Sequence, residues 1–248
     1  MDDMAERLAD MPRGGPDASC LDRMLWTDRL EYLDRDDVDP AVRRSVVTGL
    51  DKTGQWFGHH EKFAHLALEE VADVPDPRIL ELGAGHGTLS AKLLESHPTA
   101  SVTVTDVDDD SVSAIAAGEL GTDPRVTVRI MDATAIDAAG GAFDLAVFAL
   151  SFHHLPPTPA ARVLAEGTRV ADKLLIIDLP RPPTPLHLLR LATMLPFAPF
   201  VPLVHDGVIS SLRAYSPSAL RALAEHAGVD VELRGGLISP QVAVATRR

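Results

Sequence analysis

The fold of this chain is decided by one stretch, Ile79-Leu80-Glu81-Leu82-Gly83-Ala84-Gly85-His86-Gly87-Thr88-Leu89-Ser90. An apolar run ends in an acidic residue, a loop with glycine at every second position follows, and a helix-like run comes next. Glycine lets the backbone turn sharply and lets a ligand approach it closely. A strand that enters a helix through such a loop places a binding crevice at the strand's C-terminal end. The spacing E-x-G-x-G-x-G differs from the dinucleotide fingerprint G-x-G-x-x-G.

Strands alternate with helices on either side of this stretch. Five apolar or alternating segments predict strands at 78–82, 100–105, 125–131, 143–150 and 173–179, and two more close the chain at 229–233 and 241–246. This rhythm is typical of an α/β fold with a mostly parallel, Rossmann-like sheet that carries helices on both faces.

The composition excludes several classes of function. The formal net charge of -13 argues against nucleic acid as a partner, because a phosphate backbone needs a basic surface. Cys20 is the only cysteine, so an intrachain disulfide or a cysteine-based zinc site cannot form. Prolines and charged residues interrupt the apolar stretch 186–204, so it cannot make one membrane-spanning helix. With no secretory signal visible, we expect a cytoplasmic enzyme.

Acidic residues lie at the ends of the first three predicted strands: Glu81, Asp106 and Asp132. Because the carboxyl ends of parallel strands meet at one edge of a sheet, these side chains are expected to face one crevice. Like charges so close together are costly unless a cationic ligand or a ligand with several donors engages them.

These motifs together resemble the class I S-adenosylmethionine-dependent methyltransferases, strongly over 75–180 and more loosely over the closing strands. The resemblance implies a seven-stranded methyltransferase sheet and S-adenosylmethionine as cofactor. It also implies that Asp106 accepts hydrogen bonds from the ribose hydroxyls and Asp132 one from the adenine amine. The residues implied to contact the cofactor are Glu81, Gly83, Ala84, Gly85, Asp106, Val107, Asp132, Ala133 and Ala149.

The resemblance also divides the chain into parts. Residues 1–20 are expected to form a mobile tail, 21–74 a helical cover, and 75–180 the cofactor-binding core. Residues 181–214 form an apolar insertion or lid on the substrate side, and 215–248 close the core.

Two adjacent histidines follow the fourth predicted strand, in the segment Ser151-Phe152-His153-His154-Leu155-Pro156. The methyltransferases with a His-His-Leu-Pro segment here include many that act on small molecules. Histidine suits the removal of a proton from an acceptor hydroxyl, because its pKa lies near neutrality. Adjacent side chains usually diverge, so we expect one of them, His154 rather than His153, to face the acceptor. The alternative is that both cap the turn that follows.

Other aromatic and polar residues are candidates for the acceptor site, although ordinary packing explains them as well. They are Trp56, His59, His60, His205 and Tyr215. We expect no metal, because adjacent histidines lack the one-turn separation that places two ligands on one face of a helix. The apolar insertion has three further interpretations: a pocket for an apolar or lipid-linked acceptor, a homodimer contact through 181–214, or a loose membrane contact.

The sequence therefore favours a methyltransferase that acts on a small molecule, most simply at a hydroxyl oxygen of a sugar, lipid, quinone or polyketide-like compound. One alternative is a nicotinamide-dependent oxidoreductase. The glycine spacing disfavours it, and neither Tyr32 nor Tyr215 has a lysine four residues later. An alternative of another class is a non-catalytic cofactor-binding partner protein.

Overall fold

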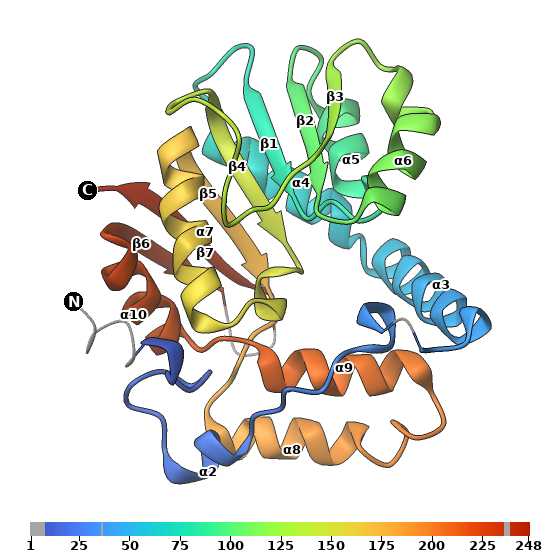
Figure 1. Cartoon of the computed structure of the whole chain (residues 1–248), viewed down its shortest axis with the longest axis vertical. Helices are drawn as coiled ribbons and strands as arrows, with labels where there is room; N and C mark the ends of the chain where they lie inside the picture. Colours follow the sequence, from blue (N-terminus) through green and yellow to red (C-terminus); the bar gives the residue numbers. More distant parts are fainter. Residues whose placement is uncertain (1–7, 36, 236–238) are drawn as a thin grey trace.

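A seven-stranded sheet forms the centre of the molecule (Figure 1). The computed structural model describes residues 8–35, 37–235 and 239–248. The strand order is β3-β2-β1-β4-β5-β7-β6; the first five strands are parallel, and β7 runs antiparallel to both β5 and β6. The strands are β1 (Arg78–Leu82), β2 (Ser101–Asp106), β3 (Val126–Ile130), β4 (Phe143–Ala149), β5 (Ala171–Asp178), β6 (Val229–Arg234) and β7 (Gln241–Arg247). The predicted α/β fold is confirmed, with strand ends displaced by at most two residues.

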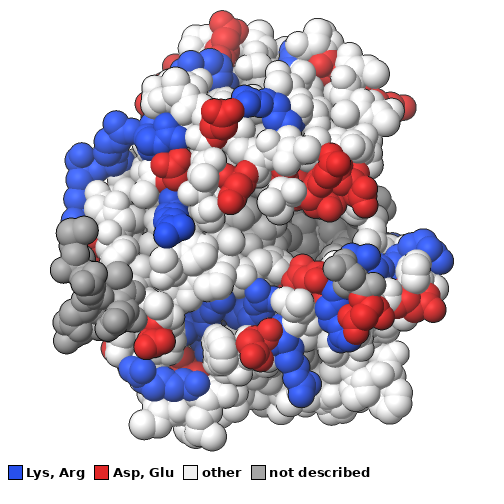
Figure 2. Space-filling view, in the orientation of Figure 1, with Lys and Arg blue, Asp and Glu red and all other residues white. Residues whose placement is uncertain are grey.

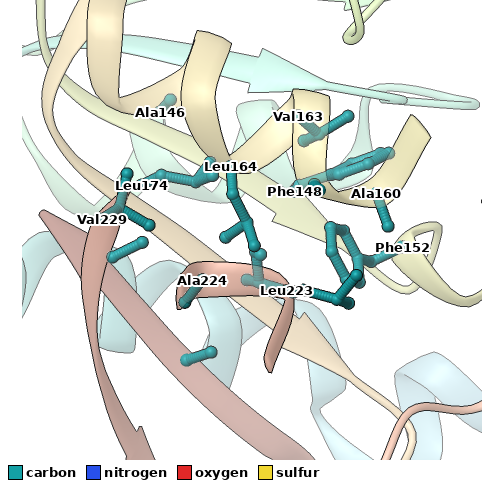
Figure 3. Packing of buried hydrophobic residues seen from close by; sticks show 14 of the residues in the cluster. Ala146, Phe148, Phe152, Ala160, Val163, Leu164, Leu174, Leu223, Ala224 and Val229 are labelled. Carbon is teal, nitrogen blue, oxygen red and sulfur yellow. The ribbon is translucent and has the colours of Figure 1, made fainter. Parts of the chain in front are cut away.

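Helices cover both faces of the sheet, because its central strands are apolar on both sides. In β5, Leu174 and Ile176 join one core while Leu175 and Ile177 join the other. The first core includes α7 and α10, and Figure 3 shows Phe148 and Phe152 packed there among aliphatic side chains. The second core includes α4 and α5. The covering helices are α4 (His59–Glu70), α5 (Thr88–Ser96), α6 (Asp109–Ala117), α7 (Pro157–Val170) and α10 (Pro217–Ala227), with a 3₁₀ turn η2 (Leu120–Thr122).

Further helices lie beyond the carboxyl ends of the parallel strands, and together they form what we call the helical cap (Figure 1). Its members are α2 (Cys20–Met24), α3 (Pro40–Phe57), α8 (Thr184–Met194) and α9 (Pro202–Arg213). The sequence predicts one helix and an irregular lid for 181–214, but the segment forms two helices, α8 and α9. One proline lies near the start of each helix, Pro185 in α8 and Pro202 in α9. Proline suits the first turn of a helix, which needs no amide donor.

The polarity of this insertion is partly inverted. It buries the polar residues His187, Asp206, Ser210, Ser211 and Arg213 alongside the apolar residues Leu191, Val208, Ile209 and Ala214. Several of its large apolar residues are exposed instead, with Phe197 59% and Phe200 82% accessible.

The N-terminal region departs from the prediction in two places. Residues 8–20 do not form a mobile tail: Leu8 is buried, and the Arg13 guanidinium donates to the Leu155 carbonyl at 2.8 Å. Residues 25–35, which we call the strap, contain only the 3₁₀ turn η1 (Tyr32–Asp34) where helical spacing was expected. The strap uses its polar groups to bind α9 rather than to continue a helix, since Tyr32 N donates to the Asp206 carboxylate.

Within the described ranges, no helix combines the length and the apolar character that crossing a membrane requires.

Candidate functional site

The glycine loop after β1 presents an open backbone surface. Gly83 has a φ of 62°, and a Cβ there would lie 2.7 Å from the Phe148 ring, so no larger residue fits. Gly85 has a φ of 55°, but a Cβ there would meet no atom within 4 Å. One glycine is therefore required by packing against β4, whereas the other leaves space in which a ligand can approach the main chain.

Asp106, the last residue of β2, is held in a fixed orientation beside this loop. Its Oδ2 accepts a hydrogen bond from Gly85 N at 2.8 Å, and its Oδ1 accepts one from Asp108 N at 3.0 Å. Each carboxylate oxygen keeps a further lone pair for a ligand. After β3, Asp132 Oδ1 accepts from the amide and hydroxyl of Thr134, both at 2.8 Å.

Glu81 supports the loop from behind instead of facing the crevice. Its side chain is only 3% exposed, and the Ser90 hydroxyl of α5 donates to its carboxylate. Burial raises the pKa of Glu81 to about 7; Ser90 opposes this shift and the negative charge of Asp106 adds to it. The structure thus assigns Glu81 to fixing α5 against β1, which corrects the expectation that all three acids face the crevice.

The remaining predicted contact residues line the same edge. Val107 is 71% exposed directly after Asp106, and three alanines are partly buried: Ala84, Ala133 and Ala149. Leu150 follows β4 with a φ of 55°, a left-handed conformation that is strained for a leucine. No sequence signal marks this residue. Figure 2 shows the surface hollowed between the sheet and the helical cap, with acidic side chains on the rim above the hollow.

His153, in the 3₁₀ turn η3 (Phe152–His154), is buried between two carboxylates. Its Nδ1 lies 2.7 Å from Asp178 Oδ1 at the end of β5, and its Nε2 lies 3.5 Å from Glu31 Oε1 of the strap. Burial alone would lower the pKa of His153, but Asp178 and Glu31 outweigh it and raise the pKa to about 9. His153 is therefore a buried imidazolium at neutral pH.

His154 is in a more open environment, with its side chain 30% exposed and its Nδ1 3.1 Å from Asp34 Oδ2. The rings of His153 and His154 lie 4.3 Å apart at an angle of 34°. The two side chains therefore do not diverge as expected. Carboxylates of the strap engage both rings and bring them to the same side.

These groups have the geometry of a possible metal site. One ligand atom each from Glu31, His153 and His154 lies within 4.8 Å of the others. The two histidines thus converge in a 3₁₀ turn without the one-turn separation on which the sequence argument against a metal relied. A cation would, however, have to displace the proton that His153 holds at neutral pH.

A cavity of about 600 Å³ lies at the strap. It is lined by Arg29, Leu30, Asp34, Arg35, Asp37 and His205. Asp34 both lines this cavity and contacts His154, so it connects the two. The exposed aromatic residues of the insertion do not line the cavity.

The structure separates the other predicted acceptor-site residues. His205 lines the cavity and stacks on Tyr32, with ring centroids 4.0 Å apart. Tyr215 is buried instead: its hydroxyl donates to the Leu155 carbonyl, Arg13 lies over its ring, and burial raises its pKa. Tyr215 is thus a packing residue.

Trp56 and the two histidines that follow lie at the junction of α3 and α4. Trp56 is 82% exposed, and His59 stacks between Phe57 and Phe63. His60 contacts Phe63 edge-on. Sequence reasoning did not identify the strap residues Glu31 and Asp34, whose only sequence signal is their acidic character.

Comparison with known proteins gives a family model and two relatives. Residues 79–173 match the family model of a methyltransferase domain. The release factor glutamine methyltransferase of Deinococcus radiodurans is 34% identical over 87 residues, which is 35% of this chain and 31% of that protein. The malonyl-[acyl-carrier protein] O-methyltransferase of Geobacter sulfurreducens is 33% identical over 105 residues, 42% of this chain and 38% of that protein. The match thus spans less than two fifths of either relative's length.

A solved structure matches the whole chain. It is a plantazolicin methyltransferase in complex with a pentazolic desmethylPZN analogue and SAH, with a TM-score of 0.67 and 11% identity over 100% of both chains. At that identity the likeness concerns the fold alone.

The charge of His153 predicts a pH dependence of stability. Its pKa in the folded chain is about 9, above the ordinary 6.5. The stabilisation that charged His153 gives the fold is therefore complete below the ordinary pKa of 6.5 and is lost as the pH rises through about 9. In His153→Gln, the Tm measured by circular dichroism should fall less over this interval than in the wild type. His65→Gln, at an exposed helix position, is the control and should behave as the wild type. Equal pH slopes for His153→Gln and the wild type would show that His153 is neutral.

Proposed function

Residues 79–173 belong to the class I S-adenosylmethionine-dependent methyltransferases, and from this premise we propose that the chain transfers a methyl group to a hydroxyl oxygen of a small polar molecule. The observation that carries the proposal is the pairing of an open glycine loop and oriented Asp106 with a histidine pair at the end of β4. The donor side and the acceptor side then meet at the carboxyl edge of the sheet.

The residues around the loop suit S-adenosylmethionine. The space beside Gly85 admits the methionine portion, and the free lone pairs of Asp106 suit the two ribose hydroxyls. Val107 offers an exposed apolar surface beside Asp106, and Asp132 keeps one oxygen for the adenine amine. When bound, the sulfonium supplies an activated methyl group that an acceptor oxygen takes up in line as the carbon–sulfur bond breaks.

The cavity beside His154 supports a polar acceptor. Charged side chains form most of its lining, and the buried face of α9 next to it is polar as well. These features favour a small molecule with hydroxyl or anionic groups over a lipid chain. One of the two relatives is by name an O-methyltransferase, while the other is by name a glutamine methyltransferase. We therefore assign the acceptor atom as oxygen on the strength of the histidines.

Of the two histidines, we propose His154 as the general base. His153 is buried and already carries a proton between Asp178 and Glu31, so it cannot accept another. His154 is partly exposed and has one ring nitrogen engaged by Asp34. Its role is to accept the hydroxyl proton as the acceptor oxygen gains the methyl group.

We also propose that the exposed apolar face of the insertion is a homodimer contact. Its residues are Leu188, Leu189, Leu195, Phe197, Phe200 and Val201. A surface of this kind on a soluble chain calls for a partner. The overall charge of -13 is unfavourable for anionic lipid, so a second copy of the chain fits better.

Replacement of Asp106 by alanine should weaken the binding of S-adenosylmethionine. The variant loses a charged acceptor, and hydrogen bonds to charged groups contribute about 1.5–3 kcal/mol, so Kd should rise by about tenfold or more. Isothermal calorimetry measures this, with Asp109→Ala on the exposed first turn of α6 as control. Binding of NAD but not of S-adenosylmethionine to the wild type would favour an oxidoreductase instead.

Replacement of His154 by alanine should abolish turnover and leave cofactor affinity unchanged. General-base catalysis contributes about 10²–10⁴-fold in rate, and kcat should fall by that order. A screen with methyl-labelled cofactor against hydroxyl-bearing metabolites supplies the acceptor for this measurement. Full turnover in His154→Ala would remove the histidine from the mechanism, and binding without any transfer would favour a non-catalytic role.

The double variant Phe197→Ser/Phe200→Ser should convert a dimer into a monomer. Both side chains are exposed in the chain, so the substitution removes apolar contact area without opening a cavity in the core. Size-exclusion chromatography with light scattering measures the mass, and Thr193→Ser, an exposed substitution on α8, is the control. A wild-type chain that is monomeric at all concentrations would contradict the proposal.

A further inference from the structure

The strap brings an acidic residue to the proposed base from a distant part of the sequence. It runs along α9 and past the carboxyl edge of the sheet (Figure 1). Asp34, in the turn η1, lies 120 positions before His154, yet its Oδ2 is 3.1 Å from His154 Nδ1. The contact joins a segment outside the sheet to the loop that follows β4.

The strap is fixed by the three residues that precede Asp34. Tyr32 N donates to Asp206 Oδ1 at 2.9 Å, and the Tyr32 ring stacks on His205. Glu31 accepts from the Ser210 hydroxyl at 2.6 Å. The Arg43 guanidinium of α3 donates to the Leu33 carbonyl at 3.0 Å. The position of Asp34 is therefore set by the strap and not by its contact with His154.

The main chain and the ring of His154 are held by different groups. The Arg213 guanidinium of α9 donates to the His154 carbonyl at 2.6 Å, which fixes the backbone. The His154 ring contacts the Asp34 carboxylate, and the ring of His153 lies beside it. The choice of protonated ring nitrogen therefore depends on Asp34.

Asp34 lies between two nitrogen donors. Its Oδ2 contacts His154 Nδ1 and also faces the Arg213 guanidinium, a setting that favours the ionised carboxylate. The Arg213 guanidinium lies 3.6 Å from Asp34 Oδ2. An ionised carboxylate can only accept hydrogen bonds, so the proton of the contact must lie on His154 Nδ1.

We propose that Asp34 is the positioning residue of the reaction: it holds the Nδ1–H tautomer of His154 and so keeps Nε2 free to take the acceptor's proton. The role of His154 as the base rests on the function proposed above, whereas its Nδ1–H tautomer does not depend on that function. In the transfer, the hydroxyl proton passes to Nε2 while the oxygen forms its bond to the methyl carbon and the carbon–sulfur bond breaks. The products are the methyl ether, S-adenosylhomocysteine and an imidazolium, which Asp34 stabilises until water takes its proton.

The charged groups that face His154 come from each element packed around it. They are Asp34 of η1, Arg213 of α9, the imidazolium of His153 and, beyond it, Glu31 and Asp178. Asp34 is the one among them that contacts a ring nitrogen of His154, so it orients the ring.

The tautomer can be tested in the free protein. In protein labelled with ¹⁵N-histidine, long-range ¹H–¹⁵N spectra distinguish the protonated from the unprotonated ring nitrogen, and the signals that disappear in His154→Gln identify His154. At a mildly alkaline pH, the wild type should show the proton on Nδ1. Asp34→Leu has a similar volume and no hydrogen-bonding group, so Nδ1–H loses its acceptor and the proton should move to Nε2.

Asp37→Leu is the matched control, because Asp37 lines the same cavity but pairs with Arg35. It should leave the His154 signals unchanged, and unchanged His153 signals in Asp34→Leu show that the strap is still docked. A wild-type proton on Nε2, or an Asp34→Leu spectrum identical to the wild type, overturns the proposal.

Kinetics provide the second measurement once an acceptor is known. In Asp34→Leu, kcat should fall by about a hundredfold or more, with the Kd for S-adenosylmethionine unchanged. If kcat stays the same although the tautomer has moved, Asp34 is not a positioning residue for the reaction. Absence of transfer by the wild type would contradict the proposed function alone, since the tautomer is read without catalysis.

Discussion

The helical cap and the sheet are joined at the imidazole of His153, which lies between the carboxylates of Asp178 and Glu31. Asp178 ends β5 and Glu31 belongs to the strap, so one buried cation bridges the core and the strap, and hydrogen bonds tie the strap to α9 of the cap. A buried charge that loses one partner costs about 3–5 kcal/mol, because the other charges stay out of water. A charge requirement therefore holds the strap against the sheet. The proposed base, His154, is the next residue, so its position depends on the same bridge.

The sheet and the donor side could be predicted from the sequence because their signals are local. The apolar run Leu174–Ile177 indicates a strand buried on both faces, and the structure places its residues alternately in the two cores. The glycines of the loop indicate a turn that no larger residue can make at Gly83. Asp106 ends its strand beside this loop simply because neighbouring parallel strands end at the same edge.

The acceptor side could not be predicted, because its contacts join distant segments. Nothing near Asp34 in the sequence indicates that it meets His154, and the apolar composition of the insertion does not say which way its side chains face. Phe200 is exposed and Arg213 is buried, against the usual preference, and the Arg213 guanidinium donates to the His154 carbonyl. Leu150 takes a left-handed conformation that only the surrounding tertiary structure can impose.

This inverted polarity ties the strap and α9 to each other. A buried polar group is stable only when it is hydrogen-bonded, and two of those on α9 find partners in the strap: Asp206 accepts from Tyr32 N, and Ser210 donates to Glu31. If the strap left α9, Asp206 and Ser210 would each lose a hydrogen-bond partner. An apolar inner face would lose no hydrogen bond in the same step. The strap therefore docks as a unit with α9, and Asp34 reaches His154 only in that docked state. The donor side is thus built into the sheet, whereas the acceptor side forms by assembly of the cap upon it.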